Sequence, residues 1–221
     1  LAVAIGVKPR RLEALLYKLV VSEFLNVNNG RFSNTDMAAY YLVEGTPNYT
    51  GGIHGMWTEQ FNAMMHTAES IRTDTAQTKM DFSGMSQEEL GGFLRGLHGS
   101  AVAAGRSLSK LPEMAEARNL IDVGGGSGGL AIALCEERPL LHATVVDLPS
   151  VVPITAQAVE ESGLTDRISV ATADILNNPL EGEFDIATAR AFFQVLSADQ
   201  SNKAAQNIGA GLVSSGTLFI L

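Results

Sequence analysis

A glycine-rich segment near the middle of the chain constrains its fold more than any other feature. Residues 120–129 read LIDVGGGSGG: an apolar run that ends at Asp122 is followed by a turn with five glycines and by a helical pattern over Gly129–Glu137. Glycine has no Cβ, so it adopts positive φ without steric cost and lets the backbone approach a ligand closely. The segment therefore predicts a strand, a tight turn and a helix whose N-terminus faces a ligand.

A second acid ends the next apolar run along the chain. Residues 145–149 read VVDLP, and Asp147 is the last residue of the strand that we expect over 143–147. A carboxylate at the end of this strand can accept hydrogen bonds from two ribose hydroxyls. We therefore expect the chain to bind a cofactor that contains a nucleoside.

The pattern beyond residue 118 predicts a parallel sheet covered by helices. Strands are expected over 119–123, 143–147, 168–173, 184–189 and 216–221, and helices over 129–137, 153–162 and 197–212. Strands that alternate with helices form parallel sheets with helices on both faces. Such sheets bind ligands at the carboxyl ends of their strands. Gly124, Asp147, Asp174 and Arg190 all stand at or just beyond predicted strand ends, so we expect the site there.

The part before residue 118 shows helical periodicity and one strong turn signal. Its expected elements are a helix that closes over 1–6, an amphipathic helix at 9–21, short strands at 24–27 and 31–33, and helices at 34–42, 51–69 and 88–111, with a polar link at 70–86. Asn28-Asn29-Gly30 is typical of a tight hairpin turn. We predict a winged-helix-like domain at 1–50, a helical region at 51–117 and the sheet domain at 118–221.

Charge and cysteine content argue against several classes of function. The 221 residues carry a net charge of −9, which disfavours binding to nucleic acid or anionic lipid. No apolar run reaches the roughly 20 residues of a membrane span, and no histidine spacing predicts a metal site. The single cysteine, Cys135, allows no internal disulfide, which is typical of a cytoplasmic protein. The winged-helix pattern leaves a DNA-binding regulator as a rival, although the helix expected at 9–21, which would read the DNA, is nearly balanced in charge.

Three features discriminate between nucleoside cofactors. The spacing of Gly124, Gly126 and Gly129 also satisfies the dinucleotide fingerprint. Asp122, however, precedes the turn, where an acid attracts a cationic group and disfavours a pyrophosphate. Asp174 follows the third strand, where it can accept from an adenine amino group, and the sheet begins only after a helical region. An adenosyl sulfonium cofactor therefore fits better than a nicotinamide, which remains the alternative.

These motifs together resemble the small-molecule O-methyltransferases, which include plant caffeate O-methyltransferase and bacterial natural-product methyltransferases. The matching pieces are DVGGGSG at 122–128, DLP at 147–149, Asp174, Phe184-Asp185 and Arg190. The resemblance implies an α/β fold with a Rossmann-like class I methyltransferase sheet, preceded by a mainly helical, winged-helix-like dimerisation domain. It also implies S-adenosylmethionine as cofactor and a homodimer. The family sheet has seven strands, so we expect this chain to lack the last two and part of the N-terminal dimerisation helices.

The resemblance also assigns expected roles to individual residues. The residues expected to bind the cofactor are Asp122, Gly124, Gly125 and Gly126 at its methionine part, Asp147 at the ribose, Asp174 and Ile175 at the adenine, Arg190 near its carboxylate, and Leu148, which follows Asp147. Phe93, Leu97 and Phe193 are expected to line the pocket of the methyl acceptor. No metal is expected among these groups.

The match departs from the family pattern at the general base. Relatives carry a histidine where this chain has Gln194, four residues after Arg190. An amide has no useful basicity, so Gln194 can position an acceptor but cannot deprotonate it. His98 is the candidate replacement base. We favour O-methylation of a small aromatic or polyketide-like molecule, as in secondary metabolism, and keep an N- or C-methyltransferase and a catalytically impaired relative as alternatives.

Overall fold

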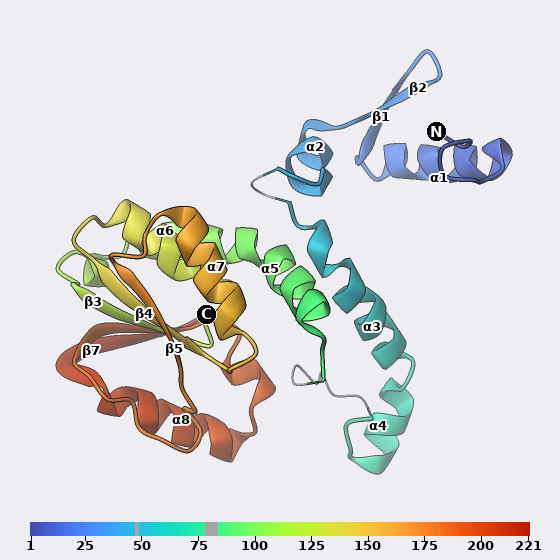
Figure 1. Ribbon diagram of the computed structural model, residues 1–221. Helices are drawn as coiled ribbons and strands as arrows, with labels where there is room; N and C mark the ends of the chain where they lie inside the picture. Colours follow the sequence, from blue (N-terminus) through green and yellow to red (C-terminus); the bar gives the residue numbers. More distant parts are fainter. Residues whose placement is uncertain (47–48, 78–83) are drawn as a thin grey trace. The chain divides into compact units, whose positions relative to one another are not determined.

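The computed structural model describes residues 1–46, 49–77 and 84–221, and the chain divides into two compact units, Leu1–Gly51 and Gly52–Leu221 (Figure 1). Part of the polar link that we expected at 70–86, residues 78–83, lies outside the described residues.

The first unit is built from two helices and a hairpin. Its elements are α1 (Pro9–Val21), β1 (Leu25–Asn28), β2 (Arg31–Asn34) and α2 (Asp36–Leu42). The predicted hairpin is confirmed: Asn28 pairs with Arg31, and Asn29 and Gly30 between them have φ of 49° and 71°, as a two-residue primed turn requires. The Tyr17 ring of α1 contacts Phe32 of β2 edge to face, with 5.3 Å between ring centroids. This contact packs the helix against the hairpin.

Two helix predictions in the N-terminal half were wrong. Leu1–Gly6 forms turns, because six residues that end in a glycine at φ 68° leave most of their backbone groups without helical partners. The helix expected at 51–69 is interrupted: a short 3-10 helix (Gly51–Ile53) precedes α3 (His54–Met64) and α4 (Thr67–Thr73). The Thr67 hydroxyl donates to the Met64 carbonyl at 2.7 Å and so satisfies the end of α3.

A long helix, α5 (Gln87–Leu108), precedes the sheet. It starts with a capping box, in which the Ser86 hydroxyl accepts from the Glu89 N–H and the Glu89 carboxylate accepts from the Ser86 N–H. A short 3-10 helix, Pro112–Met114, then leads into the first strand of the sheet.

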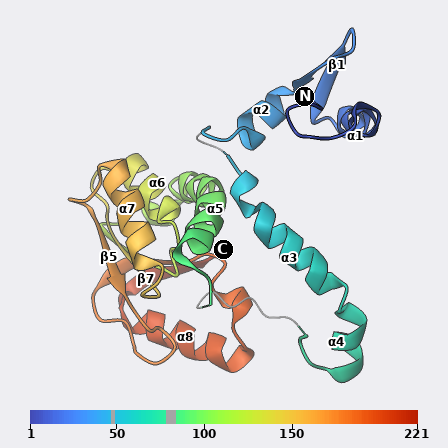
Figure 2. The same ribbon diagram turned by 45° about the vertical axis from the view of Figure 1, so that its right-hand side comes forward.

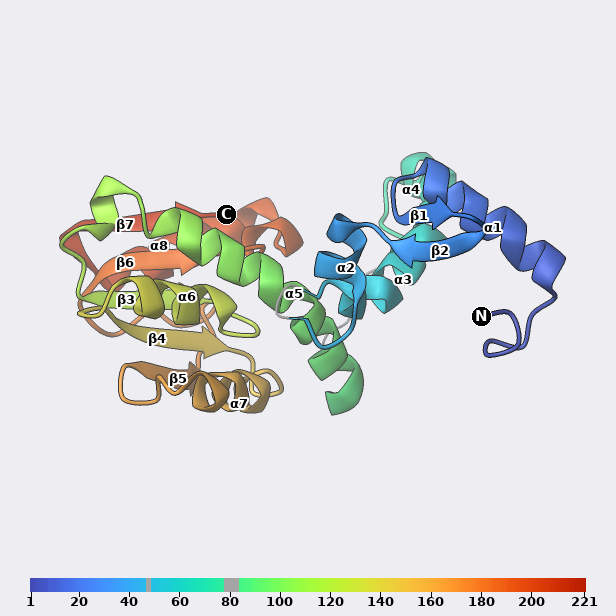
Figure 3. The same ribbon diagram turned by 90° about the horizontal axis from the view of Figure 1, so that it is seen from above.

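The second unit contains the predicted parallel sheet. Its strands are β3 (Asn119–Val123), β4 (His142–Asp147), β5 (Ile168–Thr172), β6 (Phe184–Ala189) and β7 (Leu212–Ile220), and its helices are α6 (Gly129–Glu137), α7 (Val152–Ser162) and α8 (Ala198–Ala210). All pairs are parallel in the order β5-β4-β3-β6-β7, which Figure 3 shows from above. The order reverses direction between β3 and β6, so the ligand site is expected at the carboxyl ends of these two strands.

Helices cover both faces of this sheet. Helices α5, α6 and α7 lie on one face and α8 lies on the other (Figures 1 and 2). The first face contributes Leu120, Val145 and Ile168 to a core with Leu130 and Leu134 of α6. The second contributes Ile121, Val123 and Val146 to a core with Ala204 and Ile208 of α8. Every second side chain of β3 thus enters the same core, as the period of a strand requires.

The last helix and strand differ from their predicted bounds. α8 ends at Ala210 and β7 begins at Leu212, four residues earlier than expected. Leu212 pairs with Phe184, whereas Thr217 pairs with Ile186, so the register shifts between these two pairs. A bulge of this kind interrupts the alternation of inward and outward side chains from which a strand is predicted.

In the part of the chain that the structure describes, no helix is both long enough and apolar enough to cross a bilayer.

Candidate active site

The glycine turn lies between the carboxyl end of β3 and the N-terminus of α6. Gly124, Gly126 and Gly128 have φ of 65°, 56° and 71°, backbone angles that residues with a Cβ rarely adopt. The Gly124 N–H donates to the Val146 carbonyl at 2.8 Å, and the Gly128 N–H donates to the Gly125 carbonyl at 2.9 Å. The turn is therefore held both to β4 and within itself.

Asp147, at the end of β4, holds the turn through its side chain. Its Oδ2 accepts from the Gly126 N–H at 2.8 Å, and its Oδ1 accepts from the Leu148 N–H at 2.7 Å. Burial raises the pKa of Asp147, while the N–H groups of Leu148 and Gly126 act in the opposite direction. Each carboxylate oxygen keeps a further lone pair, so the side chain can still accept from ligand hydroxyls.

Asp122 is a buried carboxylate beneath the same turn. Its side chain is 1% exposed, and its Oδ1 accepts from the Thr188 hydroxyl at 2.7 Å. Its Oδ2 has no hydrogen-bond partner among the described residues. Burial raises the pKa of Asp122 to about 7, and the Thr188 hydroxyl opposes that shift. A Cβ on Gly125 would stand 2.7 Å from Oδ2, so only glycine fits above this carboxylate.

The segment after β6 completes the edge of the site. The Arg190 guanidinium donates to the Ser100 hydroxyl of α5 at 2.9 Å. Ala191 has φ of 55°, and its N–H donates to the Leu221 carbonyl at 2.8 Å. The Phe192 ring then lies over the turn, because a Cβ on Gly124 would stand 2.9 Å from its Cδ2. Gly124 is thus required both by its backbone angle and by this ring.

The two residues expected at the adenine follow β5. Asp174 is exposed, and its carboxylate accepts from the Asn177 side chain at 2.7 Å and from the Asn177 N–H at 3.2 Å. The Asn177 side chain is the main cause that lowers the pKa of Asp174. Ile175 is buried, and its carbonyl accepts from the Asn207 side chain at 2.7 Å. Leu148, which follows β4, is 47% exposed, so its apolar side chain is accessible to a ligand.

Gln194, which stands at the position of the family's histidine, and His98, the candidate replacement base, lie in different surroundings. Gln194 is exposed in the short 3-10 helix Phe193–Val195. His98, on α5, is half-buried, and its Nδ1 lies 3.1 Å from the Ser127 hydroxyl of the glycine turn. Burial lowers the pKa of His98, against the opposing effects of Ser127, Glu136 and Glu161. The imidazole is therefore neutral near pH 7.

The residues expected to line the acceptor pocket are half-buried. Phe93 packs with Leu90, Leu94 and Val151, where α5 meets the start of α7. Leu97 lies one turn further along α5. The Phe193 ring contacts Phe192 edge to face, with 5.4 Å between centroids. Their role toward an acceptor stays a prediction.

Sequence reasoning missed two residues of the site, Thr188 and Thr155, and did not predict the contacts that Ser127 and Phe192 make. Thr188 donates to Asp122, Ser127 contacts His98, Phe192 covers Gly124, and the Thr155 hydroxyl donates to the Gly126 carbonyl at 2.5 Å. The pairing of Asp122 with Thr188 is a matter of register, since the two residues face each other across β3 and β6. No local signal in the sequence reveals such a pairing.

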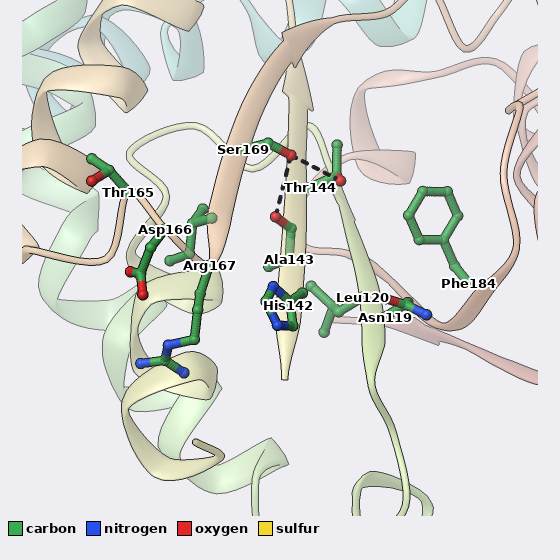
Figure 4. A pocket seen from close by; sticks show the side chains of 11 residues that line it. Asn119, Leu120, His142, Ala143, Thr144, Thr165, Asp166, Arg167, Ser169 and Phe184 are labelled. Carbon is green, nitrogen blue, oxygen red and sulfur yellow. Dashed lines mark hydrogen bonds between the residues drawn. The ribbon is translucent and has the colours of Figure 1, made fainter. Parts of the chain in front are cut away.

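A cavity of about 170 Å³ opens at the opposite edge of the sheet, where the strands begin (Figure 4). Figure 4 shows the Ser169 hydroxyl bonded to Thr144 and to the Ala143 carbonyl, so these polar groups are already paired. Arg167 donates to the Cys135 carbonyl at 2.6 Å. Because the cavity opens where the strands begin, it is separate from the glycine turn, which follows the carboxyl end of β3. No cluster of three or more potential metal ligands occurs within residues 1–46, 49–77 and 84–221.

Comparisons with known proteins agree with this geometry. The O-methyltransferase domain family matches residues 77–218. The chain is 31% identical, over 98% of its length and 64% of the relative, to 3-hydroxy-5-methyl-1-naphthoate 3-O-methyltransferase of Streptomyces sahachiroi. The chain spans 64% and 53% of the length of two of the curated relatives that it matches.

Two solved structures show the same fold. Human N-acetylserotonin methyltransferase, in complex with SAM, has a TM-score of 0.82 at 20% identity, over 99% of this chain and 67% of its own. NcsB1 of neocarzinostatin biosynthesis, in complex with SAM and 2-hydroxy-5-methyl naphthoic acid, has a TM-score of 0.76 at 20% identity, over 99% and 70%. With the family domain matching well over half of the chain, the protein belongs to the S-adenosylmethionine-dependent O-methyltransferase family.

Proposed function

We propose that the protein binds S-adenosylmethionine at the carboxyl ends of β3, β4 and β6 and transfers its methyl group to a hydroxyl of a small aromatic molecule. The observation that carries this proposal is the glycine turn, whose Gly126 N–H is held at 2.8 Å by Asp147. The turn lies where the strand order reverses, at the N-terminus of α6. When bound, the cofactor supplies a methyl group already activated by its sulfonium.

The residues present suit this cofactor. Asp147 is held by two backbone N–H groups and keeps lone pairs for the two ribose hydroxyls. Asp122 places a buried carboxylate beneath the turn, with one oxygen that has no partner among the described residues, and a cationic ligand is favoured there over a pyrophosphate. Asp174, Ile175 and Leu148 follow the next strand ends and are assigned to the adenine side. Arg190 is assigned to the carboxylate of the methionine part.

The acceptor is proposed to be a fused-ring or polyketide-like phenol. The support comes from the naphthoate methyltransferase relative and from NcsB1, whose structure contains a naphthoic acid. In this chain, Phe93, Leu97 and Phe193 are assigned to the ring of the acceptor, and the Gln194 amide to its polar group. In-line transfer from a sulfonium depends largely on alignment, so a side chain that only orients the acceptor can contribute much of the rate.

An N- or C-methyltransferase is the second candidate. The observation in its favour is Gln194, because a phenol with a pKa of about 10 benefits from a base at neutral pH. An amine or an electron-rich ring carbon needs less help. Incubating the protein with labelled S-adenosylmethionine and matched naphthol, naphthylamine and enol acceptors separates the two, since the product carries the label on oxygen, nitrogen or carbon.

Titration calorimetry tests the cofactor assignment. We expect S-adenosylmethionine to bind and NAD to give no signal. Asp147→Asn is expected to weaken binding about tenfold to a hundredfold, because charged hydrogen bonds to the ribose and to Gly126 are lost. Asp185→Asn is the matched control: Asp185 also accepts two backbone N–H groups, from Arg118 and Asn119, but at the opposite edge of the sheet.

The control should bind S-adenosylmethionine like the unmodified protein. Binding of NAD alone would replace the methyltransferase assignment with that of a nicotinamide enzyme. Equal affinities for Asp147→Asn and Asp185→Asn would remove Asp147 from the ribose site.

A further inference from the structure

His98 connects helix α5 to the glycine turn. Its Nδ1 lies 3.1 Å from the Ser127 hydroxyl, and Ser127 is only 6% exposed. The same Ser127 oxygen accepts from the Gly129 N–H at 3.4 Å, at the start of α6. A side chain of α5 therefore shares a hydrogen bond with the loop that precedes α6, across 29 residues of sequence.

The backbone around this hydrogen bond is closely packed. A Cβ on Gly129 would stand 3.0 Å from the His98 carbonyl oxygen and 3.1 Å from its Nδ1. A Cβ on Gly126 would stand 3.2 Å from Leu94 Cδ2. Leu94 and His98 are four residues apart and thus on one face of α5. This face rests directly on the turn, so a shift of the helix would be transmitted to the loop.

The ring is better suited to this contact than to proton transfer. One of its two nitrogens, Nδ1, is engaged by Ser127, and where the Ser127 hydroxyl donates to Nδ1, the other nitrogen of the neutral ring, Nε2, carries the proton and cannot act as a base. A hydroxyl both donates and accepts, so Ser127 can accept from Gly129 and still bond the neutral imidazole. The hydrogen bond needs no charge on the ring.

We propose that His98 is a positioning residue that acts through Ser127: it fixes the glycine turn against α5, the helix assigned to the methyl acceptor. The inference rests on the proposed function for the identity of the ligand. Through this contact, the acceptor side and the cofactor side of the site keep a constant separation, which an in-line displacement requires. It assigns His98 a role other than that of a general base.

The test compares four variants by their affinity for S-adenosylmethionine in calorimetry. His98→Ala and Ser127→Ala are each expected to weaken binding about threefold to tenfold, because a partly buried hydrogen bond is lost. The double variant should be no weaker than either single one, since both remove the same contact. His98→Asn should restore binding to within about twofold, because its amide occupies the place of Nδ1.

His142→Ala, at an exposed histidine where β4 begins, is the matched control and should bind like the unmodified protein. His98→Gln carries its amide nearer to the place of Nε2 and should not restore binding. Unchanged affinity in both His98→Ala and Ser127→Ala would overturn this inference alone. Normal binding but lost methyl transfer in His98→Asn would identify His98 as a base and also overturn it. No binding by the unmodified protein would overturn the proposed function instead.

Discussion

Replacing Gly105 with alanine is expected to lower the free energy of unfolding by about 3 kcal/mol, because α5 can then no longer lie against α6. Gly105 is buried, and an added Cβ would stand 2.6 Å from the Leu130 carbonyl oxygen and 2.9 Å from Ala133 Cβ. Both contacts involve atoms of α6 that cannot rotate away. Urea unfolding followed by far-UV circular dichroism measures the change.

Gly92→Ala on the same helix is the matched control. A Cβ at Gly92 has no neighbour within 4 Å, so the substitution removes a flexible residue from the helix interior without a clash. It should raise the free energy of unfolding by about 0.5–1 kcal/mol. Similar effects of the two alanines would show that the close approach of α5 to α6 does not contribute to stability.

Asp122→Asn is expected to change how stability depends on pH. Burial raises the pKa of Asp122 from 3.8 to about 7, so between these values the folded protein holds a proton that the unfolded chain has released. The contribution of this group is therefore fully present below pH 4 and is lost as pH rises through 7. Asparagine does not titrate. The stability of the variant relative to the unmodified protein should increase by about 2–3 kcal/mol from pH 5 to pH 8.

Urea unfolding at pH 5, 6, 7 and 8 and constant ionic strength gives this difference. Asp166→Asn removes an exposed carboxylate at the amino end of the sheet and should follow the unmodified protein across the series. A constant difference between Asp122→Asn and the unmodified protein would mean that Asp122 stays ionised in the folded state. In that case a cation bound close to Asp122 would have to balance its charge.

Much of the fold could be predicted because its signals are local. The hairpin at Asn29-Gly30 needs two positive φ values, which those two residues adopt. The five strands follow from apolar runs between helical patterns, and the glycine turn from its composition. Helix ends were harder to predict, because α3 ends at Met64 through a contact with the Thr67 side chain and β7 begins with a register shift.

The site was predicted as a set of positions rather than as a set of contacts. Asp122, Asp147 and Arg190 lie where the strand ends placed them. Their partners were not predicted, because Thr188 reaches Asp122 through the register of β3 against β6 and Ser100 reaches Arg190 from a helix. The hydrogen bond that the Asp174 carboxylate accepts from the Asn177 side chain was not predicted from the sequence either.

The amino-acid sequence alone determined the glycine turn, the acids that follow the strands, and through them the class of fold and cofactor. These are properties of short segments, in which φ angles and period-two burial are set by neighbouring residues. Only the tertiary structure decided what lies over and under the turn: Phe192 above Gly124, the Asp122 carboxylate beneath Gly125, and His98 on Ser127. These contacts join residues far apart in the chain, so packing decides them and the local pattern does not.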